Sequence, residues 1–386
     1  MAIEDGRHVV WLGRGLSNVY DALRIVRDAD VEGALFLVAS DSRWHAPALT
    51  IADEALSEPR RLSSAAFAEW SLEVCRQRRV DVYLPGRHHA ALTRRRAEFE
   101  ALGTRLMTPA APEVLAIIED KVAIYTLLGP EVPQPEWRVF RGVDEFDTAV
   151  GELRHRHAKL CLKPVSSMFG LGFHILDDRV SDPHRRFLGA EPLYYGYDEV
   201  RDLLRGAASP PRMLLMELLP GAERSIDCLA HRGRLVRGVV RRKKADHQVI
   251  EIDGPALDIA AEVIARLGLD GLVNVQTKDD VHGAPKLLEV NARMSGGMHQ
   301  ACLAGVPLPY WAVRLALGTA RPEDVPAAAA GQRVMPVQAA IVVGRNRRHV
   351  VAPGASDAER RARMHDMELP APEPQASARA TKGVVP

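Results

Sequence analysis

The sequence has 386 residues, of which 47% are hydrophobic, and this length favours about two or three globular domains. Lysine and arginine total 51 against 50 acidic residues, so the formal charge of +1 gives no electrostatic reason to expect nucleic acid or a membrane as the main partner. The four cysteines are far apart, which argues against a disulfide framework or a zinc site. No run approaches ~18 apolar residues, and we expect a cytoplasmic protein without a signal peptide or a membrane span.

Strand and helix patterns alternate through the first part of the chain. Apolar runs suited to strands occur at residues 7–13, 34–40 and 80–86, and stretches with helical periodicity occur at 17–29 and 64–79. Such alternation predicts a parallel sheet layered with helices, as in an α/β domain. The pattern breaks between Gly103 and Pro112, and we expect this first domain to cover residues 1–108.

After residue 108 the pattern changes to helices mixed with pairs of strands, as in an α+β fold. A helix is predicted from Pro112 to Gly129, because proline is favoured at the first helical position and glycine just after the last. Further helices are predicted at 143–156, 255–268, 297–305 and 309–318. Strands are predicted at 137–142, 159–165, 172–178, 212–219, 224–233, 234–243, 272–280, 285–293 and 333–343. We divide this part into units of 109–215 and 216–345 and expect residues 346–386 to form a flexible tail.

Polar side chains alternate along the two strands predicted at 272–280 and 285–293. Every second side chain of an extended chain shares a face, so Glu289, Asn291 and Arg293 point to one side. If the two strands pair as an antiparallel hairpin, Gln276 converges with Glu289 and Asn291. One carboxylate and two amides offer only oxygen ligands, and such a set suits Mg²⁺ or Mn²⁺. The alternative is an edge strand with a solvated polar face.

Two further segments carry weaker signals. In "KPVSSMFGLG" Lys163 ends a strand, and Gly170 and Gly172 would let backbone N–H groups approach an anion, although glycine-rich hairpin turns are common without a ligand. In "LLMELLPGAE" the backbone groups of Glu217 and Leu219 could meet the edge of a purine, and a plain hairpin is the alternative.

Taken in order, these segments resemble the ATP-grasp superfamily. The resemblance runs from about Glu119 to Leu317 and rests on "IIEDKVAIY", "CLKP", "SSMFGLG", "MELLPGAE" and "NVQ" followed by "EVNAR". Within the superfamily the chain is most similar to carboxylate-amine ligases of the carbamoyl-phosphate-synthase-like group. Its sequence motifs are similar to those of ATP-grasp proteins found near tellurite-resistance operons. The resemblance implies an N-terminal pre-ATP-grasp parallel α/β domain followed by a two-lobed ATP-grasp fold.

The resemblance also implies an activity, its cofactors and its site residues. The activity would be an ADP-forming ligase that joins a small-molecule carboxylate, an amino acid or short peptide, to an amine through an acyl phosphate; ATP and Mg²⁺ (or Mn²⁺) would be the cofactors and a homodimer the assembly. The implied nucleotide-binding residues are Lys121, Lys163, Ser166, Ser167, Gly170, Gly172, Glu217, Leu219 and Glu223. The implied metal ligands are Gln276, Glu289 and Asn291, and the implied catalytic residues, which neutralise the transferring phosphoryl group, are Arg293 and Lys163.

Substrate contacts are expected from two other places. In the run "VRRKKADH" either Arg242 or Lys244 would face the phosphates or an anionic substrate. The residues Ser295, Gly296 and Gly297 would form a small anion-binding turn for the substrate carboxylate, or else a simple helix N-cap.

Three other interpretations stay open. The turn from Gly13 to Asn18, "GRGLSN", follows a strand and opens a helix as in an NAD-dependent oxidoreductase, with Asp41 after the second strand, but Asn18 replaces the third glycine; in an ATP-grasp protein this turn would touch the acceptor substrate. The basic run could bind nucleic acid, although no aromatic residues are interleaved with it. The third interpretation is a protein that binds ATP without ligase activity. The histidines, including His88 and His89, show no metal-ligand spacing and are expected at the surface.

Overall fold

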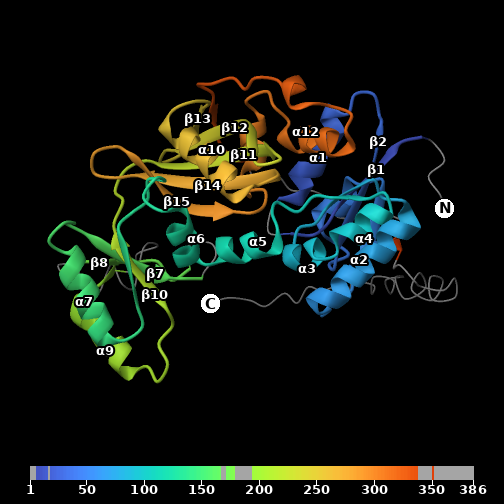
Figure 1. The fold of residues 1–386 in the computed structure, drawn as a ribbon. Coiled ribbons are helices and arrows are strands. Elements are labelled where there is room, and N and C mark those ends of the chain that lie inside the picture. Colours follow the sequence, from blue (N-terminus) through green and yellow to red (C-terminus); the bar gives the residue numbers. More distant parts are fainter. Residues whose placement is uncertain (1–5, 16–17, 167–170, 179–193, 338–349, 352–386) are drawn as a thin grey trace, which may run out of the picture.

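The computed structural model describes residues 6–15, 18–166, 171–178, 194–337 and 350–351. These residues form three sheets with helices packed against them (Figure 1). Helices α5 and α6 run between the first domain and the sheet that contains β7 and β10, below the C-terminal sheet that ends in β15 (Figure 1). Within these residues no helix is long and apolar enough to cross a membrane.

The first sheet is parallel throughout and has the strand order β17-β3-β2-β1-β4-β5. Its strands are β1 (His8–Leu12), β2 (Leu35–Asp41), β3 (Glu54–Ser57), β4 (Val82–Leu84), β5 (Arg105–Leu106) and β17 (Val350–Val351). Its helices are α1 (Val19–Ala29), the 3-10 helix η1 (Pro47–Thr50), α2 (Ser64–Arg78), α3 (His89–Thr93) and α4 (Arg96–Ala101). The nearly continuous burial of β1 and β2 follows from this layering, since helices cover both faces of a parallel sheet.

The order of the strands reverses between β1 and β4. In open α/β sheets the crevice beyond the carboxyl ends of the strands at such a reversal is where ligands bind. The two turns that follow β1 and β4 touch there, because an ideal Cβ on Gly15 would lie 2.7 Å from the Cα of Gly86.

The helix predicted from Pro112 to Gly129 is two helices, α5 (Pro112–Glu119) and α6 (Lys121–Leu128), so that prediction is wrong in one respect. Asp120 between them has φ −108° and ψ 111°, and its side chain accepts hydrogen bonds from the backbone N–H groups at positions 122 (2.8 Å) and 123 (2.9 Å). An aspartate N-cap stabilises the start of the second helix. The break puts Lys121 at the first position of α6.

The second sheet has the order β6-β10-β7-β8-β9 and is antiparallel except for the pair β8 and β9. Its strands are β6 (Trp137–Phe140), β7 (Leu160–Pro164), β8 (His174–Leu176), β9 (Tyr194–Tyr195) and β10 (Met213–Glu217), and its helices are α7 (Val143–Leu153) and α9 (Tyr197–Gly206). The apolar stripe of α7 packs on this sheet, where Phe140 and Phe146 have ring centroids 5.1 Å apart.

The third sheet is antiparallel, with the order β15-β14-β11-β12-β13-β16. Its strands are β11 (Glu223–His231), β12 (Arg234–Lys243), β13 (Gln248–Glu251), β14 (Gly271–Asp279), β15 (Pro285–Asn291) and β16 (Arg333–Val334). Its helices are α10 (Pro255–Leu267), α11 (Met298–Cys302), α12 (Leu308–Leu317) and the 3-10 helix η2 (Pro322–Asp324). Alternate residues of the central strands, among them Ile226, Val240 and Val275, pack on Val263 and Ile264 of α10. The remaining residues point to the other face, which carries the polar side chains described below.

The predicted fold class is confirmed: a parallel α/β domain precedes two further sheets with helices. The boundaries at residues 108, 215 and 345 stay predictions. Of the strand predicted at 333–343, the structure describes residues up to 337 and finds β16 there. Of the predicted tail, all residues except Val350 and Val351 lie outside the described part of the chain.

Candidate active site

The polar residues of β14 and β15 lie in the register expected from their alternation. The two strands pair antiparallel, with Gln276 opposite Glu289 and Asn274 opposite Asn291. Paired residues of adjacent strands share a face, so these four side chains form one patch, which we call the polar row. Neighbours such as Val275 point the other way and belong to the core on α10.

Three cationic side chains from different elements surround Glu289. Lys163 lies in β7 of the second sheet, Lys121 begins α6, and Arg293 follows β15. Each is close enough to Glu289 for that carboxylate to raise its pKa. The structure therefore brings together four predicted site residues that are up to 172 positions apart in the sequence, from Lys121 to Arg293.

The electrostatic balance of this cluster is positive. Lys121 is 8% exposed and Lys163 9% exposed. Burial is the largest influence on both lysines and on Arg293, and it lowers the pKa of all three because desolvation disfavours a charged group. Glu289 opposes this effect in each case, and Asp120 also opposes it at Lys121, which leaves two carboxylates among three cations. A region with this excess of positive charge is suited to an anion such as a phosphate chain.

Tyr125 of α6 connects the lysine of the second sheet to the strand that carries Glu289. The amine of Lys163 lies 3.5 Å from Tyr125 Oη and 5.7 Å from the centre of its ring. Tyr125 Oη in turn donates a hydrogen bond to the carbonyl of Leu288 in β15 at 2.8 Å. The tyrosine is fully buried, so it fixes the distance between the two sheets at this point.

The polar row fits a hard cation that also has ligands from a bound molecule. It offers carboxylate oxygens from Glu289 and amide oxygens from Gln276 and Asn291, which suit Mg²⁺ better than a metal that prefers sulfur or imidazole. The amide nitrogen of Gln276 lies 3.4 Å from Asn274 Oδ1, and that of Asn274 donates to Asp227 Oδ1 at 3.1 Å. Within the described residues no group of three or more His, Cys, Asp or Glu could hold a metal. Phosphate oxygens and water would have to complete the coordination.

A buried ion pair below the polar row was missed by the sequence analysis. Arg241 Nε of β12 donates to Asp227 Oδ2 of β11 at 2.7 Å, and their side chains are 5% and 0% exposed. Arg241 also donates to Ser225 Oγ at 2.9 Å and to Ser295 Oγ at 3.0 Å. The pair ties β11, β12 and the segment after Arg293 into one rigid support for the row.

The predicted anion contacts of Arg242 and Lys244 are not supported by their positions. Arg241 is paired with Ser225 across the sheet, so it shares the face of the polar row, and Arg242 points to the other face, where it donates to Glu251. Lys244 is exposed beyond the end of β12. Two adjacent residues of a strand face opposite ways, and the basic run alone does not reveal which of them faces inward.

The turn from Ser295 to Gly297 leads into α11. Gly297 is the N-cap residue, and its N–H donates to Ser295 Oγ at 3.2 Å, while Gly296 is exposed. An ideal Cβ on Gly297 would lie 2.5 Å from Nη1 of Arg241, so the glycine makes room for that guanidinium. The contacts match the helix N-cap alternative, and the anion-binding role of these three residues stays a prediction.

The residues predicted for adenine and ribose lie where the second sheet meets the third. Glu217, which ends β10, is 7% exposed, and its carboxylate accepts a hydrogen bond from Lys286 Nζ at 2.5 Å. Leu219 is buried two residues later. Glu223 begins β11 and accepts through Oε1 from Lys243. The backbone contacts predicted for Glu217 and Leu219 stay predictions.

Gly221 joins these residues to the hairpin of β14 and β15. Its N–H donates to the carbonyl of Asp279 at 3.0 Å. An ideal Cβ at this position would lie 2.6 Å from the Cβ and 2.9 Å from the carbonyl oxygen of Asp279. The backbone contact therefore requires a glycine, which explains part of the segment "LLPGAE".

Only part of the predicted glycine loop lies among the described residues. Ser166 is exposed just after β7. Gly172 has φ +76°, and an ideal Cβ there would lie 2.7 Å from Pro164 Cγ, so it turns tightly over the end of β7. Ser167 and Gly170 lie outside the described residues, and their contact with phosphate stays a prediction.

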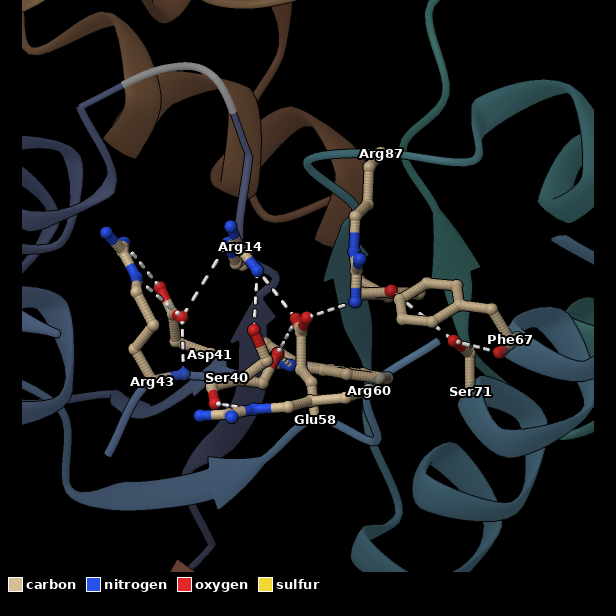
Figure 2. A network of polar contacts seen from close by, with 12 residues as sticks. Arg14, Ser40, Asp41, Arg43, Glu58, Arg60, Phe67, Ser71 and Arg87 are labelled. Carbon is tan, nitrogen blue, oxygen red and sulfur yellow. Dashed lines mark hydrogen bonds and ion pairs between the residues drawn. The ribbon is translucent and has the colours of Figure 1, made fainter. Parts of the chain in front are cut away.

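A cluster rich in arginine lies at the carboxyl edge of the first sheet. Figure 2 shows Arg14 and Arg87 on either side of Glu58, whose side chain is fully buried. Glu58 accepts from the backbone N–H of Arg14 at 3.1 Å and from Arg87 Nη2 at 2.6 Å, and Asp41 accepts from Arg43 Nη2 at 3.0 Å. Burial raises the pKa of Glu58, and Arg87 is the largest influence in the other direction. The cluster has more guanidinium groups than carboxylates, which favours an anionic ligand at this edge.

A small cavity of about 40 Å³ lies between this edge and the polar row. It is lined by the turns of Gly13 and Gly86 on one side and by Arg293 on the other. His89 also lines it, its Nε2 hydrogen-bonds the carbonyl of Pro85 at 3.0 Å, and burial lowers the pKa of this histidine. His89 is therefore half-buried opposite Arg293, and not fully at the surface as expected for the histidines.

Comparisons with known proteins agree with this architecture. Solved structures similar to this chain include an ADP complex of purK, N5-carboxyaminoimidazole ribonucleotide synthetase (TM-score 0.58, 14% identity, 84% of this chain and 79% of that chain covered). They also include an L-amino acid ligase from Bacillus licheniformis (TM-score 0.55, 14% identity, 83% of this chain and 78% of that chain covered). A third is the biotin carboxylase domain of Hydrogenobacter thermophilus 2-oxoglutarate carboxylase with MgADP, ADP and bicarbonate (TM-score 0.57, 17% identity, 82% of this chain and 72% of that chain covered). At these identities the likeness shows the fold alone. No curated protein sequence matches the chain.

The similar solved structures share this fold, in which an N-terminal α/β domain precedes two further sheets, and the family model agrees with the ATP-grasp superfamily expected from the sequence. More particularly, residues 209–340 match the family described as ATP-grasp in the biosynthetic pathway with Ter operon. This matched segment contains β10 to β16, and therefore the polar row and Arg293.

Proposed function

We propose that this protein is an ATP-dependent carboxylate-amine ligase that forms an amide or peptide bond through an acyl phosphate and releases ADP and phosphate. The observation that carries the proposal is the excess of positive charge around Glu289, from the buried Lys121 and Lys163 and the half-buried Arg293. Buried cations are stabilised by an anion with several oxygens, and the phosphate chain of ATP supplies one. Two of the similar solved structures contain ADP, which supports a nucleotide at this position.

The nucleotide would lie between the second and third sheets. Lys121 and Lys163 would bind the α- and β-phosphates, and the backbone of Glu217 and Leu219 would meet the adenine edge. Glu223 would hold the ribose hydroxyls through Oε2, because Lys243 already donates to Oε1. The loop residues Ser166, Ser167, Gly170 and Gly172 would cover the phosphates from the opposite side.

Magnesium would be held by Gln276, Glu289 and Asn291, and when bound it neutralises charge on the phosphate oxygens. Its single carboxylate ligand makes the site dependent on phosphate oxygens, so metal and nucleotide are expected to bind together. Arg241 and Asp227 would position the strands that carry these ligands, since their ion pair joins β11 to β12 beside the polar row.

The chemistry consists of two displacements. A carboxylate oxygen of the first substrate attacks the γ-phosphorus, the bond to ADP breaks, and an acyl phosphate forms. The nitrogen of the amine then attacks the acyl carbon, phosphate leaves, and the amine loses one proton. Phosphoryl transfer depends on positioning and charge neutralisation, and Arg293 and Lys163 would provide both for the transferring group. No covalent enzyme nucleophile is needed.

The second substrate would enter from the first domain. The cavity of about 40 Å³ lined by Gly13, Gly86 and Arg293 lies between the reversal point of the parallel sheet and Arg293, and it would have to widen to admit a substrate. The arginine cluster around Arg14 and Arg87 lies at the same edge and would attract a substrate that carries a carboxylate or phosphate. This position gives the turn "GRGLSN" a role in an ATP-grasp protein in place of dinucleotide binding.

The experiment that tests the proposal measures ADP release with Mg·ATP, pooled amino acids and hydroxylamine, and scores hydroxamate in the same samples. We expect hydroxamate together with ADP, because hydroxylamine traps an acyl phosphate; division of the pool then identifies the acid. ADP release that is independent of any added acid would instead support a protein that binds ATP without ligase activity. A variant with Glu289→Gln serves as the control for contaminating ATPases.

A further inference from the structure

A second and larger cavity lies at another joint between the first domain and the C-terminal lobe. Its volume is about 360 Å³, and ligand pockets typically have about 300–1,000 Å³. Its walls come from the segment after β5, the turn between β11 and β12, the first residues of β14, and the stretch from α12 to η2. Pockets of small molecules are common at domain joints, because two rigid bodies supply complementary walls.

This cavity is separate from the polar row. It reaches Asp270 and Gly271 at the start of β14, whereas Asn274, the nearest residue of the polar row on this strand, lies three residues further along. At about 3.3 Å per residue the two places are roughly 10 Å apart along β14. A nucleotide bound at the polar row would therefore leave the cavity accessible.

One side of the cavity is apolar. Met107, Ala316 and Leu317 line it with partly exposed side chains, whereas the other apolar lining residues, Leu106, Leu229, Ala312 and Leu315, are at least nine-tenths buried. Met107 extends the apolar wall, since its Cε lies 3.5 Å from the position of an ideal Cβ on Gly271. A ligand that fills this side needs an apolar body.

The other side carries four arginines, Arg96, Arg105, Arg232 and Arg321, against one acidic residue, Asp270. Arg96 is fixed in the wall, because it donates to the carbonyl of Leu106 at 2.8 Å and to Thr108 Oγ1 at 2.6 Å. The carboxylate of Asp270 is already used, since its Oδ1 accepts from the backbone N–H groups of Arg232 (3.2 Å) and Gly271 (3.0 Å). The excess of guanidinium groups favours a carboxylate, sulfonate or phosphate group on the ligand.

We propose that this joint cavity is a second ligand site, which binds a small molecule with one anionic group and an apolar body. The anion would lie among Arg96, Arg232 and Arg321, and the apolar body would lie against Met107, Ala316 and Leu317. The site is independent of the proposed ligase reaction and would exist in a protein that only binds ATP.

The test uses 8-anilinonaphthalene-1-sulfonate, which combines a sulfonate with an apolar aromatic body and gains fluorescence in an apolar environment. The full-length protein is titrated with this dye in the presence of saturating Mg·ATP analogue, so that the nucleotide site is filled. We expect saturable binding with one dye per chain. We also expect displacement by hexanoate and much weaker displacement by inorganic phosphate at the same concentration, because phosphate has no apolar body.

Variants locate the dye. Arg232→Ala combined with Arg321→Ala removes two exposed side chains, and we expect at least tenfold weaker binding with an unchanged melting curve. Arg234→Ala, an exposed arginine two residues along from Arg232 and outside the cavity lining, is the matched control and should bind as the wild type does. Ala316→Trp should abolish binding by filling the cavity. Equal affinity in the double variant and the control, no saturable binding, or displacement by phosphate as effective as that by hexanoate would each overturn the proposal.

Discussion

Replacement of Lys163 by methionine should weaken nucleotide binding without weakening the fold. The lysine is 9% exposed, and burial lowers its pKa, because its amine is removed from water with Tyr125 Oη at 3.5 Å as a neighbour and Glu289 as a charge partner shared with other cations. A neutral side chain of similar length avoids that desolvation. Because Lys121 and Arg293 remain as partners of Glu289, the removal of one buried cation leaves no carboxylate unpaired, so we expect Lys163→Met to unfold at the same or a higher urea concentration.

Nucleotide binding should weaken in Lys163→Met, in contrast to the stability of the fold. Removal of one partner of a buried charge pair typically costs about 2–5 kcal/mol of binding free energy, which corresponds to a dissociation constant raised roughly 30-fold to several thousand-fold. Isothermal titration calorimetry with a non-hydrolysable Mg·ATP analogue measures this change. Lys159→Met, an exposed lysine just before the same strand, is the matched control and should alter neither quantity. If Lys163→Met kept wild-type affinity, or if it unfolded at a clearly lower urea concentration, the assignment of Lys163 to the phosphates would be wrong.

The same lysine gives a pH dependence with a defined sign. Its pKa is lower in the folded protein than the value of about 10.4 in the unfolded chain, so between these two values the unfolded state binds more protons. The free energy of unfolding of the apo protein should therefore rise with pH through that window. The advantage of Lys163→Met over the wild type should shrink over the same range, which urea titrations at successive pH values can measure.

Three further predictions concern the polar row and its support. Glu289→Gln should abolish Mg·ATP turnover and leave the circular dichroism spectrum unchanged, and turnover in the folded variant would contradict the metal assignment. Gly221→Ala should destabilise the fold by about 1–3 kcal/mol in urea titrations because its Cβ has no room, whereas Gly151→Ala in open space within α7 should be neutral or stabilising; equal effects would contradict the close contact. Arg241→Met should cost about 3–5 kcal/mol because it leaves Asp227 buried without its partner, and the double variant with Asp227→Leu should regain much of that loss; no recovery would show that the pair is not the unit of stability.

The alternation of residues predicted the central part of the site well. Spacing by two placed Glu289 and Asn291 on one face, which the structure reproduces, and such spacing is local geometry that a single sequence records well. The parallel first domain was predictable for the same reason. The position of Glu289 and Asn291 opposite Gln276 and Asn274 also depends on a bulge between Gln276 and Thr277, which the spacing does not reveal.

What escaped prediction depends on contacts between distant segments. Which residues of β12 face the polar row decides that Arg241 is buried and Arg242 is not. That orientation depends on Asp227 and Ser225, which lie on another strand. The break at Asp120 needs the side chain to cap α6, which competes with a continuous helix of similar periodicity. The arginine cluster of the first domain comes from the ends of four different strands, so no single sequence motif predicts it.

The most direct measurement of the proposed chemistry follows oxygen. The acid identified in the pooled assay is labelled with ¹⁸O in its carboxylate. It is incubated with the protein, Mg·ATP and the amine, and the released phosphate is analysed by mass spectrometry. An acyl-phosphate mechanism transfers one labelled oxygen into each phosphate, and we expect that result in step with ADP. Phosphate without label, formed together with ADP, would show that water and not the carboxylate attacks the γ-phosphorus, and it would contradict the proposed ligase.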